Sequence, residues 1–115
     1  MISTFAREWQ EGRRFSLAIR RRSDGEAVGS VELRPTGSEA DVSYMVAPEL
    51  RAQGLASRAL VALIAWGMRE LGLRRFNLAC HVENTASQRV AEKSGFVFVC
   101  QEGDELRFRR DTTPA

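Results

Sequence analysis

The segment from Val46 to Ser57 carries the residues best suited to binding a charged ligand: Val-Ala-Pro-Glu-Leu-Arg-Ala-Gln-Gly-Leu-Ala-Ser. Pro48 cannot donate to a sheet ladder, so it ends the preceding strand. Arg51 brings positive charge close to Gly54, where the backbone can approach a ligand without an intervening side chain. Small residues then open a helix, whose first N–H groups and dipole favour a phosphate. The pattern predicts a diphosphate-binding loop, and an ordinary strand-to-helix loop with a glycine is the alternative.

The elements that must position this loop follow from hydrophobic periodicity. Phe5 and Trp9 have helical spacing and Gly12 would end that helix, whereas Phe15, Leu17 and Ile19 alternate as in a half-buried strand. Further alternating segments predict strands, and two segments with helical spacing or a good N-cap predict helices. The predicted strands span residues 15–19, 27–34, 40–46, 75–81, 96–100 and 106–110, and the helices span 55–71 and 84–94.

The segment 40–81 is a strand, a loop, a helix and a second strand. Such a crossover makes its two strands parallel neighbours. Ligands collect at the C-terminal ends of parallel strands in sheets of this kind. We therefore expect the functional site around Val46–Ser57 and His81–Ser87.

Length and composition indicate one ordinary domain. The 115 residues suffice for one core, and the hydrophobic fraction of 43% and charged fraction of 28% are typical of soluble proteins. The longest apolar run, Leu60–Met68, is far below the roughly 20 residues of a membrane span. Charged residues interrupt the N-terminal stretch where a signal peptide would be apolar. We expect a soluble, cytoplasmic protein.

Metal and nucleic-acid binding are disfavoured. Cys80, Cys100 and the single histidine, His81, lack the spacing of a zinc site, so the cysteines are expected to be buried and reduced. The basic cluster Arg20–Arg22 is followed at once by acidic residues, and the net charge is only +2. A solvated hairpin end is a better interpretation than a nucleic-acid footprint.

Two motifs carry a resemblance to a known family. Arg51-Ala52-Gln53-Gly54-Leu55-Ala56 resembles the Arg/Gln-x-x-Gly-x-Gly/Ala pattern of the GNAT superfamily of N-acetyltransferases. Asn84-x-x-Ser87, followed by Glu92-Lys93-Ser94-Gly95-Phe96, resembles the second half of that signature. The similarity is greatest to the subgroup of ribosomal-protein alanine acetyltransferases.

The resemblance implies an α/β fold with a mixed sheet (α+β) over a single domain, residues 1–115. The expected order is α-βββ-α-β-α-ββ, which lacks the first strand and helix of the family and is therefore N-terminally short. It also implies an N-acetyltransferase that transfers an acetyl group from acetyl-CoA to a primary amine, such as a protein N-terminus or a small molecule, by direct attack in a ternary complex. No metal is implied.

The resemblance also assigns the cofactor site. In the family, coenzyme A lies between two splayed parallel strands, its pantetheine pairs with the backbone of the first strand, and its diphosphate sits on the amides that open the helix. The corresponding residues here are Met45, Val46, Arg51, Gln53, Gly54, Leu55, Ala56, Ser57 and Asn84, with Arg58 as a weaker candidate.

Catalytic roles are implied in the same way. Ser87 lies one helical turn after Asn84 and corresponds to the serine that protonates the departing thiolate. Asp41, acting directly or through water, is the expected base, although the family often has a glutamate before a Gly-Tyr pair there. Each has a structural alternative: capping for Asn84, packing for Ser87 and a solvent-facing strand position for Asp41.

Three other residues are secondary candidates. Glu32 on the neighbouring strand is another possible base, and His81 has a suitable pKa for one. Tyr44 would either line the acceptor pocket or belong to the core.

The short N-terminus predicts an unpaired sheet edge, and exposed edges invite pairing with another chain. We therefore expect a homodimer. The same shortness leaves a second function open, a catalytically weak acyl-CoA-binding or regulatory module. A nucleic-acid-binding domain is a third, less favoured interpretation.

Overall fold

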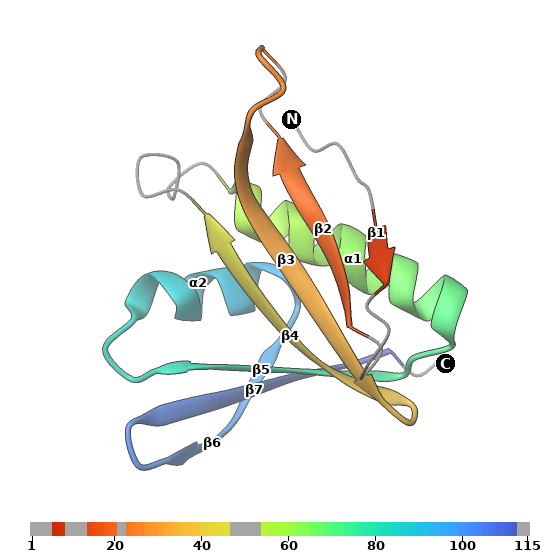
Figure 1. Cartoon of the computed structure of the whole chain (residues 1–115). Helices are drawn as coiled ribbons and strands as arrows, with labels where there is room; N and C mark the ends of the chain where they lie inside the picture. The colour runs from red at the N-terminus through yellow and green to blue at the C-terminus, as the bar shows by residue number, and fades with distance from the viewer. Residues whose placement is uncertain (1–5, 9–13, 21–22, 47–53, 113–115) are drawn as a thin grey trace.

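The computed structural model describes residues 6–8, 14–20, 23–46 and 54–112, which form seven strands and two helices (Figure 1). In chain order these are β1 (Ala6–Glu8), β2 (Phe15–Arg20), β3 (Ala27–Thr36), β4 (Glu39–Val46), α1 (Leu55–Leu71), β5 (Arg75–His81), α2 (Thr85–Lys93), β6 (Val97–Glu102) and β7 (Glu105–Asp111).

All the strands belong to one mixed sheet with the order β1-β2-β3-β4-β5-β7-β6. Every neighbouring pair is antiparallel except β4 and β5, which are parallel because α1 connects them as a crossover. The predicted crossover is thereby confirmed, as is the α/β class with a mixed sheet.

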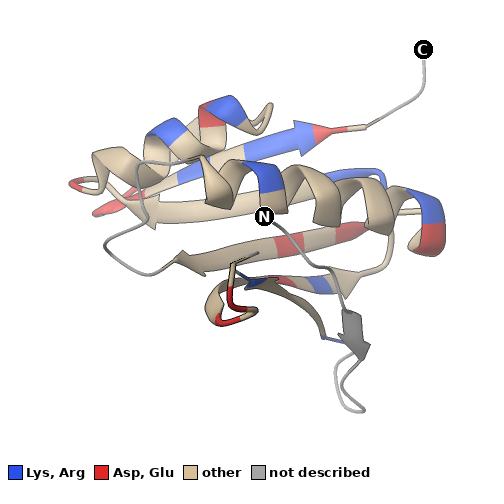
Figure 2. Cartoon of the chain, turned by 90° about the horizontal axis from the view of Figure 1, so that it is seen from above, with Lys and Arg blue, Asp and Glu red and all other residues tan. Residues whose placement is uncertain are grey.

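Both helices cover the same face of the sheet (Figures 1 and 2). The long helix α1 packs on β2, β3 and β4, while α2 packs on β5 and on α1. Alternate strand residues such as Ile19, Val31, Leu33 and Phe76 point into this layer and are almost fully buried. Among the described residues the opposite face has no helix, and polar residues such as Glu32, Arg34 and Asp41, which alternate with buried ones, lie on it.

The strands β4 and β5 separate soon after they begin. Their pairing is limited to Glu39–Asp41 opposite Arg75–Asn77. Beyond these pairs β4 stays with β3 as far as Val46, and β5 stays with β7 as far as His81. The sheet therefore opens between β4 and β5 into a V-shaped gap, visible in Figure 1 as their divergence from a shared end.

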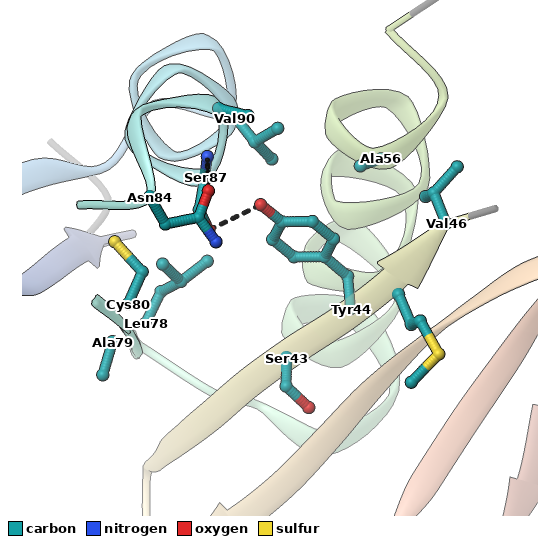
Figure 3. Close-up of a pocket in the computed structure, with 12 residues that line it drawn as sticks. Ser43, Tyr44, Val46, Ala56, Leu78, Ala79, Cys80, Asn84, Ser87 and Val90 are labelled. Carbon is teal, nitrogen blue, oxygen red and sulfur yellow. Dashed lines mark hydrogen bonds between the residues drawn. The ribbon is translucent and has the colours of Figure 1, made fainter. Parts of the chain in front are cut away.

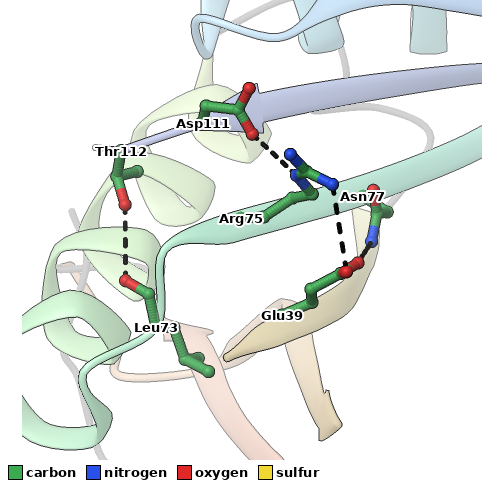
Figure 4. Close-up of polar contacts among 6 residues, drawn as sticks. All are labelled: Glu39, Leu73, Arg75, Asn77, Asp111 and Thr112. Atoms are coloured by element: carbon green, nitrogen blue, oxygen red, sulfur yellow. Dashed lines mark hydrogen bonds and ion pairs between the residues drawn. The ribbon is translucent and has the colours of Figure 1, made fainter. Parts of the chain in front are cut away.

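Polar contacts fasten the closed end of this gap (Figure 4). The Arg75 Nε donates to Asp111 Oδ1 at 2.8 Å, and Nη1 lies 3.9 Å from Glu39 Oε2. The Asn77 amide donates to Glu39 Oε1 at 3.1 Å. These contacts lie beside the backbone pairs that join β4, β5 and β7 at one end, and the opening lies at the other end, which leads to the helices.

Two details differ from the sequence prediction. A strand, β1, occupies Ala6–Glu8 where an N-terminal helix was expected, so the described elements begin with a strand; the neighbouring Phe5, Trp9 and Gly12 lie outside the described residues. β3 continues past residue 34, where the strand was predicted to end, and therefore contains Pro35. This proline is accommodated because β2 pairs with β3 only as far as Leu33, so Pro35 lies beyond the part of β3 that is paired on both sides.

The other predicted elements are confirmed to within a few residues, and Gly72 is the C-cap of α1. Within the described ranges, no helix is long and apolar enough to span a membrane.

Candidate functional site

A cavity of about 330 Å³ lies at the open end of the gap, between β4, β5 and the two helices (Figure 3). This size is at the lower end of the range for small-molecule sites. Its walls are mostly apolar, with a few hydroxyl, thiol and amide groups. It is lined by Ser43, Tyr44, Met45, Val46, Ala56, Leu78, Ala79, Cys80, Asn84, Ala86, Ser87 and Val90.

The N-terminus of α1 borders this cavity through Ala56. Its N-cap, Gly54, has a φ of 74°, in the left-handed region that favours glycine. No described side chain caps the helix, and its first turn has no acidic residue. Among the described residues, and apart from its chain neighbours, no heavy atom lies within 4 Å of a Cβ added to Gly54. The backbone amides and the helix dipole are therefore suited to an anion.

Ser87 connects the two sides of the cavity. Its Oγ lies 2.6 Å from the hydroxyl of Tyr44, so a hydrogen bond joins α2 to β4 across the gap (Figure 3). The Asn84 Oδ1 accepts a hydrogen bond from the Ser87 N–H at 3.0 Å. Asn84 is thus the N-cap of α2, as its capping alternative predicted, and it lines the cavity at the same time.

Cys80 is a member of the site that the sequence suggested only as a buried thiol. It is buried on β5 and lines the cavity beside Ser87. Burial raises the pKa of the Cys80 thiol, a hydrogen bond with Ser87 partly offsets this, and the charge of Glu105 adds to the rise. The thiol is therefore neutral near pH 7. Cys80 follows Leu78 by two residues, so both side chains face the same side of β5. This spacing, close to the end of the strand, was the sequence signal that Cys80 belongs to the site.

The residues expected to bind the cofactor are only partly described. Met45, Val46, Ala56 and Asn84 line the cavity, while Gly54, Leu55, Ser57 and Arg58 form the start of α1 next to it. The Ser57 hydroxyl donates to the Gly54 carbonyl at 3.1 Å. Arg51 and Gln53 lie outside the described residues.

The candidate bases are not in this cavity. Asp41 is exposed, because it alternates with Val42 and Tyr44 and so faces away from the helices. Glu32 accepts from Arg34 Nη1 at 2.7 Å and is confined to the uncovered face. His81 is exposed at the end of β5, where its Nδ1 accepts a hydrogen bond from the Glu83 N–H at 3.0 Å. Neither Glu32 nor His81 lines the cavities described here.

Asp41 instead lines a second cavity, of about 420 Å³. The first and second cavities share Ser43, Leu78 and Ala79, residues of β4 and β5 that flank the gap. The two cavities therefore meet where the strands separate. One reactant in each would face the other through the gap.

A family model described as "Acetyltransferase (GNAT) domain" matches residues 1–97. The uncharacterized N-acetyltransferase YoaA of Bacillus subtilis is 32% identical over 99 residues, covering 84% of this chain and 56% of that protein. The ribosomal-protein-serine acetyltransferase of Escherichia coli is 32% identical over 77 residues, covering 64% of this chain and 43% of its own length. The chain thus spans about half the length of these relatives.

The fold is also found among solved structures. The ribosomal-protein-S5-alanine acetyltransferase of Vibrio fischeri superposes with a TM-score of 0.79 at 18% sequence identity. The superposition covers 86% of this chain and 62% of that one. At this identity the match shows a shared fold.

Proposed function

Because the chain belongs to the GNAT acetyltransferase family, we propose that it binds acetyl-CoA in the gap between β4 and β5 and transfers the acetyl group to a primary amine. The observation that carries this proposal is the gap itself, with a cavity at its open end and the uncapped start of α1 beside it. Family membership alone would not say where in this chain the cosubstrate lies.

The gap supports an extended ligand on β4. Past Asp41, the side of β4 that faces β5 is no longer paired with that strand. A pantetheine arm carries amide groups and can therefore add to Met45 and Val46 as a further strand would. The diphosphate would then lie on the amides of Gly54, Leu55, Ala56 and Ser57. Arg51 and Gln53, from the same motif, and Arg58 are proposed to assist there.

Ser87 is proposed to protonate the thiolate that leaves. A hydroxyl has one proton to donate and can accept other hydrogen bonds. If Tyr44 donates to Ser87 Oγ at 2.6 Å, the serine keeps its own proton, which it can donate to the Cys80 sulfur or, as proposed, to the departing sulfur in the cavity. The Asn84 oxygen is occupied by the cap, and its NH₂ group is proposed to contact the pantetheine arm.

Direct attack by the amine is proposed over a covalent acyl-enzyme. Cys80 is the described thiol in the cavity, and its raised pKa keeps it neutral. The thiolate, not the thiol, is the nucleophile. The amine would reach the thioester from the second cavity, where Asp41 is proposed to accept its proton directly or through water.

A module that binds acyl-CoA without turnover is the second candidate. The observation in its favour is that Asp41 and Ser87 line different cavities. Saturable binding of acetyl-CoA without transfer to any amine would favour this module over the enzyme.

The binding site is tested by replacing Gly54 with tryptophan. Side-chain bulk at this position would cover the start of α1, so we expect the affinity for acetyl-CoA to fall at least about tenfold, or about 1.4 kcal/mol. Isothermal titration calorimetry gives the affinity directly. A tryptophan at φ 74° also strains the backbone by roughly 1–2 kcal/mol.

Two variants separate the bulk from the strain. Gly54→Ala introduces the strain with little bulk, and Gly25→Trp introduces both at another open, positive-φ glycine far along the chain. Both should bind acetyl-CoA nearly as the natural protein does. Equal affinity for Gly54→Trp and the natural protein would overturn the proposed site.

A further inference from the structure

We propose that the second cavity selects an acceptor that carries an anionic group, such as a carboxylate, in addition to its amine. The inference rests on the proposed acetyl transfer and names the substrate class of that reaction. It comes from the charges that line the cavity and from which of them already have partners.

The cavity lies over a row of paired residues on the uncovered face. Arg34 is opposite Asp41, Asp41 is opposite Asn77, and Asn77 is opposite Arg109, on β3, β4, β5 and β7. Directly paired residues of neighbouring strands point to the same face. With strands about 4.8 Å apart, the backbones of Asp41 and Arg109 are roughly 10 Å apart, with Asn77 between them.

Most of the charged side chains that line the second cavity have an ion-pair partner. Arg34 is paired with Glu32 at 2.7 Å. Arg107 lies 2.8 Å from both Glu102 and Glu105.

Asp41 and Arg109 are the exceptions. In the part of the chain that the structure describes, Asp41 and Arg109 each line the cavity without an ion pair. The cavity therefore offers one uncompensated carboxylate and one uncompensated guanidinium, on the two sides of Asn77.

These two charges fit a dipolar ligand. Asp41 attracts the ammonium form of an amine and lies at the last paired position before the gap, so the amine is directed toward the gap. Arg109 can hold a carboxylate with two parallel hydrogen bonds. A diamine of the same length would bring a second cation to Arg109, and like charges placed together disfavour the wrong ligand.

The acceptor class is tested with matched amines of three lengths. Gamma-aminobutyrate, delta-aminovalerate and epsilon-aminocaproate are each compared with the alkylamine, which has no second charged group, and with the diamine of similar length. Initial rates of CoA release at saturating acetyl-CoA give kcat/KM. We expect the amino acid to be the best acceptor at one length or more, and the diamine the poorest. A kcat/KM that is higher for the diamine than for both the amino acid and the alkylamine at every length would overturn the proposal.

Arg109→Gln tests the residue. We expect kcat/KM to fall about ten- to hundredfold for the amino acid, the range for a hydrogen bond to a charged group, and to stay unchanged for the alkylamine. Arg109→Glu should make the diamine the preferred acceptor. Arg69→Gln, on the exposed surface of α1, is the matched control and should alter none of the rates. An equal loss for all three amines would assign Arg109 a structural role only.

Binding distinguishes failure of this inference from failure of the proposed enzyme. If no amine is acetylated, calorimetry on the CoA-loaded protein still measures the affinity for epsilon-aminocaproate and for cadaverine. If the amino acid binds more tightly than cadaverine and Arg109→Gln abolishes this preference, the proposed acceptor site is supported although the proposed transfer reaction is not. If neither epsilon-aminocaproate nor cadaverine binds, or if cadaverine binds more tightly, the proposed acceptor site is wrong.

Discussion

Ser87 is the residue on which three elements converge. Its Oγ meets the Tyr44 hydroxyl from β4, its N–H is held by Asn84 at the start of α2, and the Cys80 thiol of β5 lies beside it. A buried hydroxyl with such fixed partners has a defined orientation. This is the property that a proton donor requires.

Removing the Ser87 hydroxyl should therefore reduce turnover more than binding. We expect Ser87→Ala to lower kcat about a hundredfold, the lower range for a general acid, and Tyr44→Phe to lower it by a smaller factor because the serine is retained but less well oriented. Stopped-flow or steady-state rates, with acetyl-CoA affinity measured separately, check the split.

Ser94→Ala is the control for these variants. Ser94 is a buried serine at the C-terminal end of α2 whose hydroxyl donates to Val90 O at 2.7 Å, and it does not itself line the cavity. Its loss should reduce thermal stability and leave kcat unchanged. A Ser87→Ala variant with the full kcat would exclude the proton-donor role.

At this scale, sequence predicts what depends on local spacing. The cap by Asn84 and the one-turn distance to Ser87 follow from three residues of chain. The alternation of Asp41 with Val42 and Tyr44 already implied that Asp41 faces away from the helices, although it does not reveal the second cavity. The contact between Tyr44 and Ser87 spans 43 residues, and no local pattern could predict it.

Among the elements, β4 depends on a close approach by β3. Gly29 is opposite Val46, and a Cβ added to Gly29 would lie 2.4 Å from the Met45 carbonyl oxygen. A side chain there must push the end of β4 away. Met45 and Val46 are the residues on which the pantetheine is proposed to pair, so this crowding reaches the site without touching a ligand.

We expect Gly29→Ala to destabilise the fold by about 1–3 kcal/mol, the range for overpacking, and to weaken acetyl-CoA binding. Urea unfolding measures the first effect, and calorimetry on the folded variant measures the second. Ser30→Ala, at the next position of β3 and exposed, is the matched control and should change neither. If Gly29→Ala leaves both stability and affinity unchanged, β4 can move at no cost, contrary to the packing described above.

The elements themselves were well predicted because most have strong signals. Period-two alternation marks β2 and β5, and α1 begins after Gly54 and ends at Gly72. The strand β1 was missed because Phe5 and Trp9 have helical spacing, whereas pairing with Phe15–Leu17 decides the conformation of Ala6–Glu8. Local propensity is weaker than such tertiary pairing.

For the whole molecule, the gap between β4 and β5 is the feature that sequence could not supply. Family resemblance implied a splay, but its extent follows from where the pairing of β4 with β5 stops, beside the contacts of Arg75 with Asp111 and Glu39. Those partners are far apart along the chain. The fold class and the parallel pairing of β4 with β5 could be inferred from alternation and the crossover rule, whereas the position along β4 at which that pairing stops required the packed structure.

The edges of the sheet bear on the expected homodimer, which stays a prediction. In the described part of the chain β1 covers β2 only along Phe15–Leu17. At the other edge, β6 exposes Val97, Phe98 and Val99, with 65%, 57% and 41% of each residue accessible. Edge strands that lack charges are prone to pair with another chain.

We therefore predict that the protein is a dimer at micromolar concentration by light scattering, and that Val97→Lys combined with Phe98→Lys makes it a monomer. Lysine on an edge strand opposes pairing, because each subunit would bring its positive charges to the same interface. Val61→Lys, at an exposed position of α1, is the control and should remain dimeric. A dimer that persists in the double variant would move the interface to the β1–β2 edge. A monomeric natural protein would exclude the dimer.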